Sequence, residues 1–298
     1  EIREMQSTAL VTKAAHCAAM QHTRPGVHER EIAAAFHHVI ARSGLRTAYD
    51  SIVTVQGEVL HNFRYTNIAE DGHLLLLDGG AEAATGYATD VTRTWPVSGT
   101  FSRQQRHAYE AVLASQMAAI EMIRPGVRYR DVHRKASAVL AEYLVDEGLL
   151  CCAVEEAVDT GAHAIFFPHG VGHLIGLDVH DMENFGDRVA YPKDRRRSSQ
   201  FGTGYLRLDL DLSAGMCVTI EPGFYVVPAI LHDPKFRTRF KDQVNFAKAE
   251  EWIGFGGIRI EDDVLVTDNG HDVLTSAIPK EVTDIEQLVG TISSPTTL

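Results

Sequence analysis

Apolar residues recur at helical spacing in four stretches of the first 147 residues. The stretches span residues 2–21, 29–42, 102–123 and 128–147. Each shows the repeat of three to four residues that is typical of an amphipathic helix. Arg24-Pro25-Gly26 and Arg124-Pro125-Gly126 separate the two members of each pair, as expected of residues that interrupt helices. The pattern therefore predicts two helical pairs with the same order of elements.

Short apolar runs of β type follow each helical pair. Leu74 to Leu77 predicts a buried strand, and residues 87–94 predict a second strand that forms a hairpin with it. Two more strand-like stretches, 216–227 and 256–267, follow the second helical pair. This repeated order suggests an internal duplication. Because no linker divides the chain, we expect one α+β domain over residues 1–298.

Composition narrows the class of protein. The chain has 28 basic and 40 acidic residues, a net charge of −12, and 45% hydrophobic residues. This is the composition of a folded protein, and its acidic balance argues against nucleic-acid binding. The longest aliphatic run has four residues, whereas a membrane span needs about 20. The four cysteines form no CxxC pair, so we expect reduced thiols in a cytoplasmic protein.

Acidic residues at the ends of apolar segments are the main chemical signal, because the motifs HExxH, GxSxG, GxGxxG and the P-loop are absent. Asp78 ends the four-leucine strand, and the expected hairpin brings it to the same side as Asp90. Glu221 and Glu261 end later apolar segments. Ordinary alternatives remain, since Asp78 can be a turn residue and Asp90 can pair with Arg93.

Four carboxylates in apolar surroundings predict a shared cationic centre. Acids are rarely buried unless they are paired or bind a cation, and four carboxylates neutralise two divalent ions. His169 and His173 lie four residues apart in a segment whose proline and glycines argue against a helix. We therefore expect one of these histidines to bind metal and the other to face the substrate, although a structural role is the alternative.

These residues resemble the pita-bread metallopeptidases, the family of methionine aminopeptidase, aminopeptidase P and prolidase, over essentially the whole chain. The resemblance implies pseudo-twofold α/β halves around a curved antiparallel sheet. It also implies five ligands for two divalent ions: Asp78, Asp90, His173, Glu221 and Glu261. Members of the Xaa-Pro branch usually carry a separate N-terminal domain of creatinase type, and nothing in this chain corresponds to it. We therefore expect a single catalytic domain.

Three short sequence motifs resemble those of the Xaa-Pro branch more than those of the methionine aminopeptidases. They are His169 to His173, Gly176 to Asp181, and Arg259 to Asp262. The insertion from Val227 to Gly254 favours prolidase over aminopeptidase P. So does Arg207, which falls where prolidases carry the arginine that grips the dipeptide carboxylate. A surface arginine is the alternative interpretation of Arg207.

The resemblance also implies roles around the metal centre. Asp90 and Glu261 would bridge the ions, and Glu221 would act as general base. His169 and His180 would hydrogen-bond the substrate carbonyl or the tetrahedral intermediate. The remaining predicted residues would bind substrate or support the acids: Tyr49, His61, Arg207 and Arg259.

The expected function is hydrolysis of Xaa-Pro dipeptides, with aminopeptidase P activity as the alternative. A metal-free binding protein or a creatinase-like hydrolase of the same fold is a remote third possibility. Oxygen ligands with one imidazole favour manganese, and cobalt or zinc also fit. We expect a proline-containing peptide as substrate and a homodimer as the assembly.

Overall fold

The computed structural model describes residues 1–292 and confirms the four long helices to within a few residues. They are α1 (Ile2–His22), α2 (Glu29–Arg42), α3 (Arg103–Ile120) and α4 (Tyr129–Asp146). A capping box begins α3, because the Ser102 side chain accepts the Gln105 N–H while the Gln105 side chain accepts the Ser102 N–H. The shorter helices are α5 (Val154–Thr160), α6 (Asp187–Ala190), α7 (Pro228–Leu231), α8 (Pro234–Arg239), α9 (Phe246–Glu250) and α10 (Val282–Leu288), with 3₁₀ turns η1 (Ala162–Ile165), η2 (Glu183–Phe185) and η3 (Thr203–Tyr205).

The two Arg-Pro-Gly tripeptides adopt the same backbone arrangement. Gly26 has φ +89° and Gly126 has φ +84°, a left-handed conformation that glycine adopts without steric cost. The N–H of Gly26 donates to Ala69 O at 2.7 Å, and the N–H of Gly126 donates to Leu212 O at 2.8 Å. Each helical pair is thus tied in the same way to the chain that follows it. The expected duplication is present in the backbone.

Short antiparallel strands form the centre of the molecule. They are β1 (Arg46–Thr47), β2 (Ile52–Thr54), β3 (Leu74–Asp78), β4 (Ala81–Glu82), β5 (Thr92–Pro96), β6 (Cys217–Ile220), β7 (Gly223–Tyr225), β8 (Gly257–Arg259), β9 (Asp262–Val266) and β10 (His271–Val273). Within residues 1–292 they pair in the orders β2-β3-β5, β10-β9-β6, β7-β8 and β1-β4. The mixture of helices and antiparallel strands confirms the α+β class.

The second strand of the predicted hairpin lies later in the chain than the sequence pattern indicated. It spans Thr92–Pro96 rather than residues 87–94, and its register pairs Asp78 with Thr92. Asp90 therefore precedes the strand instead of lying within it. The Asp90 N–H does not take part in strand pairing, because it donates to the side-chain carboxylate of Asp263 in β9 at 3.2 Å.

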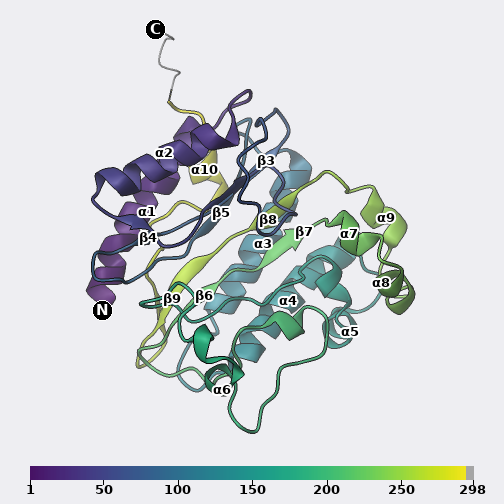
Figure 1. The fold of residues 1–298 in the computed structure, drawn as a ribbon. Helices are drawn as coiled ribbons and strands as arrows, with labels where there is room; N and C mark the ends of the chain where they lie inside the picture. Colours follow the sequence, from purple (N-terminus) through teal and green to yellow (C-terminus); the bar gives the residue numbers. More distant parts are fainter. Residues whose placement is uncertain (293–298) are drawn as a thin grey trace.

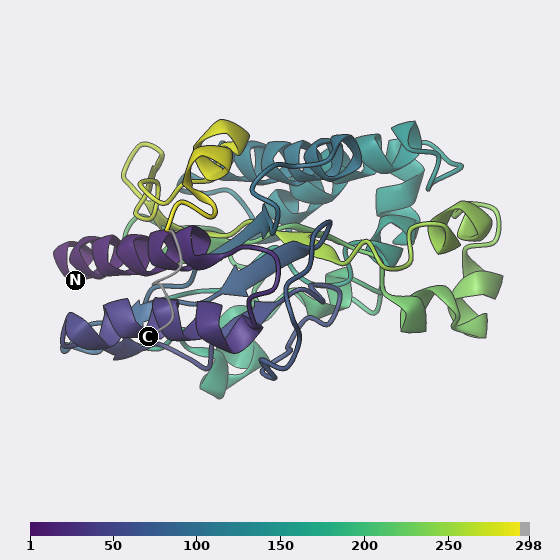
Figure 2. The ribbon, with the colours of Figure 1, turned by 90° about the horizontal axis from the view of Figure 1, so that it is seen from above.

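The two halves meet where β5 lies beside β8 and β9. The Glu261 N–H donates to Thr92 O at 3.0 Å, and the Arg259 N–H donates to the Thr94 hydroxyl at 3.2 Å. In Figure 1 the strands run diagonally between the α1–α2 pair at upper left and helices α4 and α5 at lower right. Figure 2 shows α10 beside α1, so the end of the described chain packs against its beginning.

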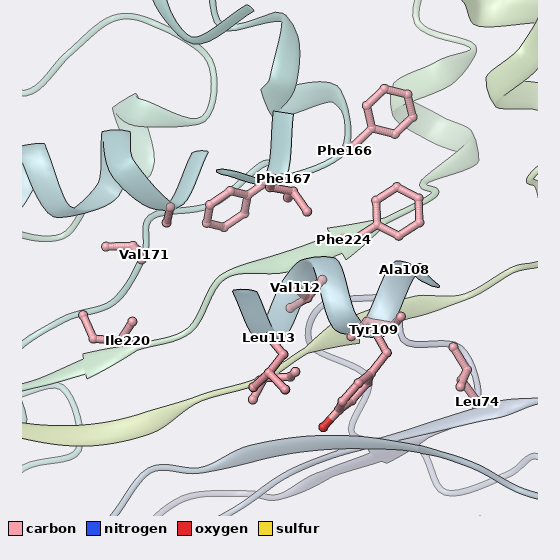
Figure 3. Close-up of a cluster of buried hydrophobic side chains, with 14 of the residues drawn as sticks. Leu74, Ala108, Tyr109, Val112, Leu113, Phe166, Phe167, Val171, Ile220 and Phe224 are labelled. Atoms are coloured by element: carbon pink, nitrogen blue, oxygen red, sulfur yellow. The ribbon is translucent and has the colours of Figure 1, made fainter. Parts of the chain in front are cut away.

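One hydrophobic core runs through both halves. Figure 3 shows Tyr109, Val112 and Leu113 projecting from α3 in the same cluster as Phe224 of β7 and Leu74 of β3. Helix α3 contacts β6, β7 and β8, so its buried face holds the second half in place. No helix in residues 1–292 combines the length and the apolar character needed to cross a membrane.

Two histidines are buried in the second half with few partners. His133 of α4 and His163 of η1 are each 1% exposed. Neither ring nitrogen of His133 has a hydrogen-bond partner within residues 1–292, and His163 uses only Nδ1, at Ala157 O. Burial lowers the pKa of His133 to about 3, helped by the nearby His163, His169, Arg134 and Arg130. Burial and Arg134 lower the pKa of His163 to about 4, against the opposing bond to Ala157.

We expect this pair to make the fold sensitive to mild acid. In the unfolded chain both histidines protonate near pH 6.5, whereas the folded chain keeps them neutral, so stability falls as the pH drops below that value. Between pH 7.5 and 5.5 the pair should remove about 2–3 kcal/mol of unfolding free energy, measured by urea titration. His133→Leu should remove about half of this dependence, whereas the same change at the exposed His38 should not. An unchanged pH dependence in His133→Leu would contradict the explanation.

Candidate metal centre

The four predicted acids converge where the two halves meet. Asp78 ends β3, Glu221 directly follows β6, and Glu261 directly precedes β9. Ligand atoms of Asp78, Asp90 and Glu261 all lie within 4.8 Å of one another, and so do those of His173, Glu221 and Glu261. The fold therefore gathers all five predicted ligands, from segments far apart in the sequence, into one cluster.

His173 reaches the cluster because its segment lies along β6. The Glu221 N–H donates to Val171 O at 2.8 Å, and the Thr219 N–H donates to His173 O at 2.9 Å. Between them Gly172 has φ +151°, and a Cβ atom there would lie only 2.2 Å from Thr219 O. A residue with a side chain would push the segment away from β6, so the glycine next to His173 is required by the close approach.

The hydrogen bond at Nδ1 sets the tautomer of His173. This nitrogen lies 2.9 Å from Leu174 O, and because a carbonyl oxygen only accepts, Nδ1 carries the proton. Nε2 faces the acids, at 3.2 Å from Asp90 Oδ2 and 3.8 Å from Glu221 Oε1. The hydrogen bond and charge of Asp90 outweigh burial and raise the pKa of His173. A divalent ion would take the place of the proton on Nε2. A metal-ligating histidine is usually oriented by such a bond to its other nitrogen.

The cluster concentrates negative charge away from water. Burial raises the pKa of Glu221 to about 7, and burial with the neighbouring carboxylates raises that of Glu261 well above its usual value. Burial also raises the pKa of Asp78, against the opposing charge of Arg259. At Asp90 burial is outweighed by the hydrogen bond and charge of His173, so the pKa falls. Divalent cations would stabilise all four carboxylates in their charged form, so the donor set fits two such ions.

Arg259 connects the acids through a chain of hydrogen bonds. Its guanidinium donates to Asp78 Oδ2 at 2.6 Å, to the Tyr225 hydroxyl at 3.0 Å and to the Thr92 hydroxyl at 3.0 Å. The Thr92 hydroxyl in turn donates to Glu261 Oε2 at 2.6 Å. Arg259 was predicted from the sequence, but Tyr225 and Thr92 were not. Asp90 and Glu221 both lie outside the strands that carry Thr92 and Tyr225, so strand periodicity could not have indicated these two residues.

Tyr49 contacts the ligand acids directly. Its hydroxyl lies 2.6 Å from Asp78 Oδ1 and also contacts Asp90 Oδ1. Burial and the adjacent Asp78, Asp90 and Glu261 raise its pKa well above 10, so the hydroxyl keeps its proton as a donor. A single hydroxyl proton serves one acceptor at a time. Tyr49, predicted to bind substrate, is therefore also placed to orient the two aspartates.

The two predicted catalytic histidines have different surroundings. Both nitrogens of His169 are engaged, Nδ1 at 2.8 Å from Gly170 O and Nε2 at 2.9 Å from the Tyr225 hydroxyl. Burial and the charge of Arg259 lower its pKa to about 3. His180 is partly exposed and packs edge-on against His173, with ring centroids 4.5 Å apart. Burial and His173 lower the pKa of His180 to about 4.

All of the predicted site residues line one cavity of about 900 Å³. His61 stacks on the exposed ring of Phe63, 6.3 Å between centroids. Arg207 is paired with Glu183, since its Nη1 lies 2.9 and 2.6 Å from the two carboxylate oxygens. Glu183 was not among the predicted residues, and only its proximity in the fold reveals it.

Comparison with known proteins places the chain in a family. The sequence profile of metallopeptidase family M24 matches residues 3–268. The chain is 36% identical over 292 residues to a Xaa-Pro aminopeptidase of Haemophilus influenzae and 33% identical over 295 residues to the human Xaa-Pro dipeptidase. The chain therefore belongs to metallopeptidase family M24.

A solved structure supports the same assignment. The aminopeptidase PepP of Pseudomonas aeruginosa matches 97% of this chain with a TM-score of 0.78 and 35% identity. The pita-bread fold expected from the resemblance is thereby confirmed. The alignments cover 97% and 96% of this chain but only 59% and 58% of the two curated relatives, and 58% of the solved structure. The chain thus spans less than two thirds of their length.

Proposed function

We propose that the chain is the catalytic part of a dinuclear-metal peptidase that hydrolyses the bond before proline. The main supporting observation is the overlap of three ligand groups. They are Asp78, Asp90 and Glu261; His173, Glu221 and Glu261; and Asp90, His173 and His180. Asp90 and Glu261 are the carboxylates that each belong to two of these groups, so both would be shared between two ions. The Xaa-Pro peptidases among its relatives support the substrate class.

Manganese is the metal that this ligand set favours, with cobalt and zinc as alternatives. When bound, two divalent ions supply a water of lowered pKa and a polarised peptide carbonyl. All five ligands lie together in one buried cluster. Such a cluster of carboxylates is unfavourable unless it binds cations, so it supports a metallopeptidase over a metal-free binding protein or a creatinase-like hydrolase.

Different residues of the protein would then transfer the proton, bind the substrate carbonyl and hold the other side chains in place. Glu221 would take the proton of the attacking water on its free carboxylate oxygen and pass it to the leaving proline nitrogen. His180, the less enclosed histidine, would donate to the substrate carbonyl oxygen. Arg259 and Tyr225 would hold Asp78 and His169 in place through their hydrogen bonds.

The substrate is either an Xaa-Pro dipeptide or the longer peptide of an aminopeptidase P, and residues of the cavity support each alternative. We propose Xaa-Pro dipeptides first, because Arg207 lines the cavity with the ligand acids and a guanidinium can hold a free carboxylate with two parallel bonds. Its pairing with Glu183 favours the alternative, an aminopeptidase P, since a guanidinium already paired is less available to the peptide. His61 and Tyr49 would line either substrate.

Metal removal followed by peptide assays tests the function. The protein treated with a chelator should lose cleavage of Xaa-Pro peptides, and added manganese should restore it with close to two ions bound per chain. A bound-metal content near zero, or equal cleavage of peptides with alanine in place of proline, would overturn the proposal. That residues 1–298 form a single catalytic domain stays a prediction, as do the homodimer, the cytoplasmic location and the lack of nucleic-acid binding.

Arg207→Ala should separate the two substrate types. If Arg207 binds the dipeptide carboxylate, the change should weaken Xaa-Pro binding by about 1.5–3 kcal/mol, while Xaa-Pro-Yaa tripeptides are cleaved almost as before. The measurement is kcat/KM for both peptides. Arg197→Ala is the matched control, because Arg197 also lines the cavity and is paired with an acid, Asp187. Equal losses on both peptides, or a wild-type preference for tripeptides, would favour aminopeptidase P.

A further inference from the structure

Glu58 lies on a firmly held loop that forms part of the cavity wall. The loop follows β2, and the Val55 N–H donates to the buried Glu29 carboxylate at 2.9 Å. Gly57 packs so closely on β8 that a Cβ atom there would lie 2.6 Å from Gly257 O. Between these anchors and His61, the side chain of Glu58 lines the same cavity as the ligand acids. Its position is therefore set by the backbone around it.

The carboxylate of Glu58 has no partner for its buried oxygen. Oε2 is buried and makes no hydrogen bond within the part of the chain that the structure describes. Burial raises the pKa of Glu58, and no charged neighbour contributes to the shift. A carboxylate in this position is unfavourable unless it gains a cation or a hydrogen-bond donor. Because Glu58 also lines the cavity, a cationic group bound there can contact the carboxyl group, which can turn to expose its buried oxygen.

An apolar wall connects the ligand cluster with Glu58. Ile52 and Leu60 pack in one cluster with Tyr225, next to Val227. Ile52 pairs in register with Asp78, so one end of this wall adjoins the ligand acids. At the other end the Val226 N–H donates to Gly256 O at 3.3 Å, and Gly256 adjoins Glu58 Oε2. A substrate side chain that extends from the metal centre along this wall would contact apolar side chains first and the Glu58 carboxylate at its far end.

We propose that Glu58 selects peptides whose residue before proline has a cationic side chain, arginine or lysine. This rests on the proposed function, which places the scissile carbonyl at the ligand cluster and the first side chain on the wall. The aliphatic stem of arginine or lysine packs on Ile52, Leu60 and Val227, and the charged head meets Glu58. The substrate α-amino group is a less suitable partner, because it cannot use the apolar wall.

Citrulline provides the matched probe, since its side chain resembles that of arginine but is neutral. We expect the wild-type protein to have kcat/KM for Arg-Pro peptides on the order of 10- to 100-fold above that for citrulline-Pro peptides, the range of a hydrogen bond to a charged group. Both peptides are assayed as dipeptides and with a third residue. Glu58→Gln should reduce the ratio to near one, and Glu58→Asp should leave an intermediate ratio. Glu70→Gln, an exposed position outside the cavity, is the control and should leave the ratio unchanged.

Each other result would overturn the proposal in a distinguishable way. A wild-type ratio near one excludes selection by charge. An equal loss on both peptides in Glu58→Gln assigns the carboxylate to the α-amino group that both share. If no Xaa-Pro peptide is cleaved, the proposed function fails, and calorimetric binding of the two peptides to wild type and Glu58→Gln then decides the role of Glu58. Circular dichroism establishes that the variants are folded.

Discussion

Glu221→Gln is expected to leave the protein folded and to lower kcat by about 10²- to 10⁴-fold, the usual contribution of general acid–base catalysis. Glu221 directly follows β6, and its N–H donates to Val171 O. The backbone therefore holds residue 221 in the same place whether its side chain ends in a carboxylate or an amide. The amide keeps one oxygen for a metal but cannot accept a proton from water at neutral pH. The measurement is kcat on an Xaa-Pro peptide with manganese in excess.

Metal content separates the two functions of Glu221. The variant should still bind close to two ions per chain, in which case the lost activity reflects proton transfer rather than a lost metal. Glu121→Gln makes the same chemical change at an exposed position outside the cavity and should keep full activity. A Glu221→Gln protein with more than about a tenth of wild-type kcat would contradict the assigned role, given the range above.

Arg93→Met is expected to lower the unfolding free energy by about 3–5 kcal/mol, because it breaks the buried pair with Asp262 and leaves backbone oxygens without their donor. Lys280 remains a second cationic partner of Asp262, with Nζ 2.8 Å from Oδ2. Arg93 and Asp262 are both fully buried and lie 2.8 Å apart. Arg93 also donates to the backbone oxygens of Thr92 and Glu261, at 3.0 and 2.6 Å, so it joins the two halves beside the metal centre. Urea titration measures the change.

Two variants control this prediction. Arg106→Met removes an exposed arginine that binds Glu286 through two contacts of 3.0 Å, and it should change stability by less than about 1 kcal/mol. Adding Lys280→Met to Arg93→Met should lower stability further, because Lys280 is the remaining cationic partner of Asp262. A loss for Arg93→Met no larger than that for Arg106→Met would contradict the argument.

The sequence also offered Arg93 as a partner for Asp90, and the fold decides against it. Arg93 binds Asp262, whereas Asp90 contacts His173 and Tyr49. Arg93 lies in β5, three residues after Asp90 and beyond the point where the strand begins. The Asp90 N–H instead donates to Asp263, which lies 173 residues away in the chain. Local spacing could not reveal such a contact.

The four long helices and the α+β class could be predicted from the amino-acid pattern, and the five candidate ligands from the resemblance to the pita-bread metallopeptidases. Helices depend on contacts three and four residues apart, which the apolar pattern records directly. The ligand acids could be recognised because a carboxylate at the end of an apolar strand needs a compensating charge, and this need is visible in a few neighbouring residues.

Which further side chains complete the site depends on how the two halves pack together. Tyr225 links Arg259 to His169, Glu183 pairs with Arg207, and Glu58 closes the apolar wall of the cavity. Each of these side chains is ordinary in its own stretch of sequence. They acquire a role because the two halves pack together and bring strands from distant parts of the chain within hydrogen-bond distance. That packing depends on the whole core, and no local pattern encodes it.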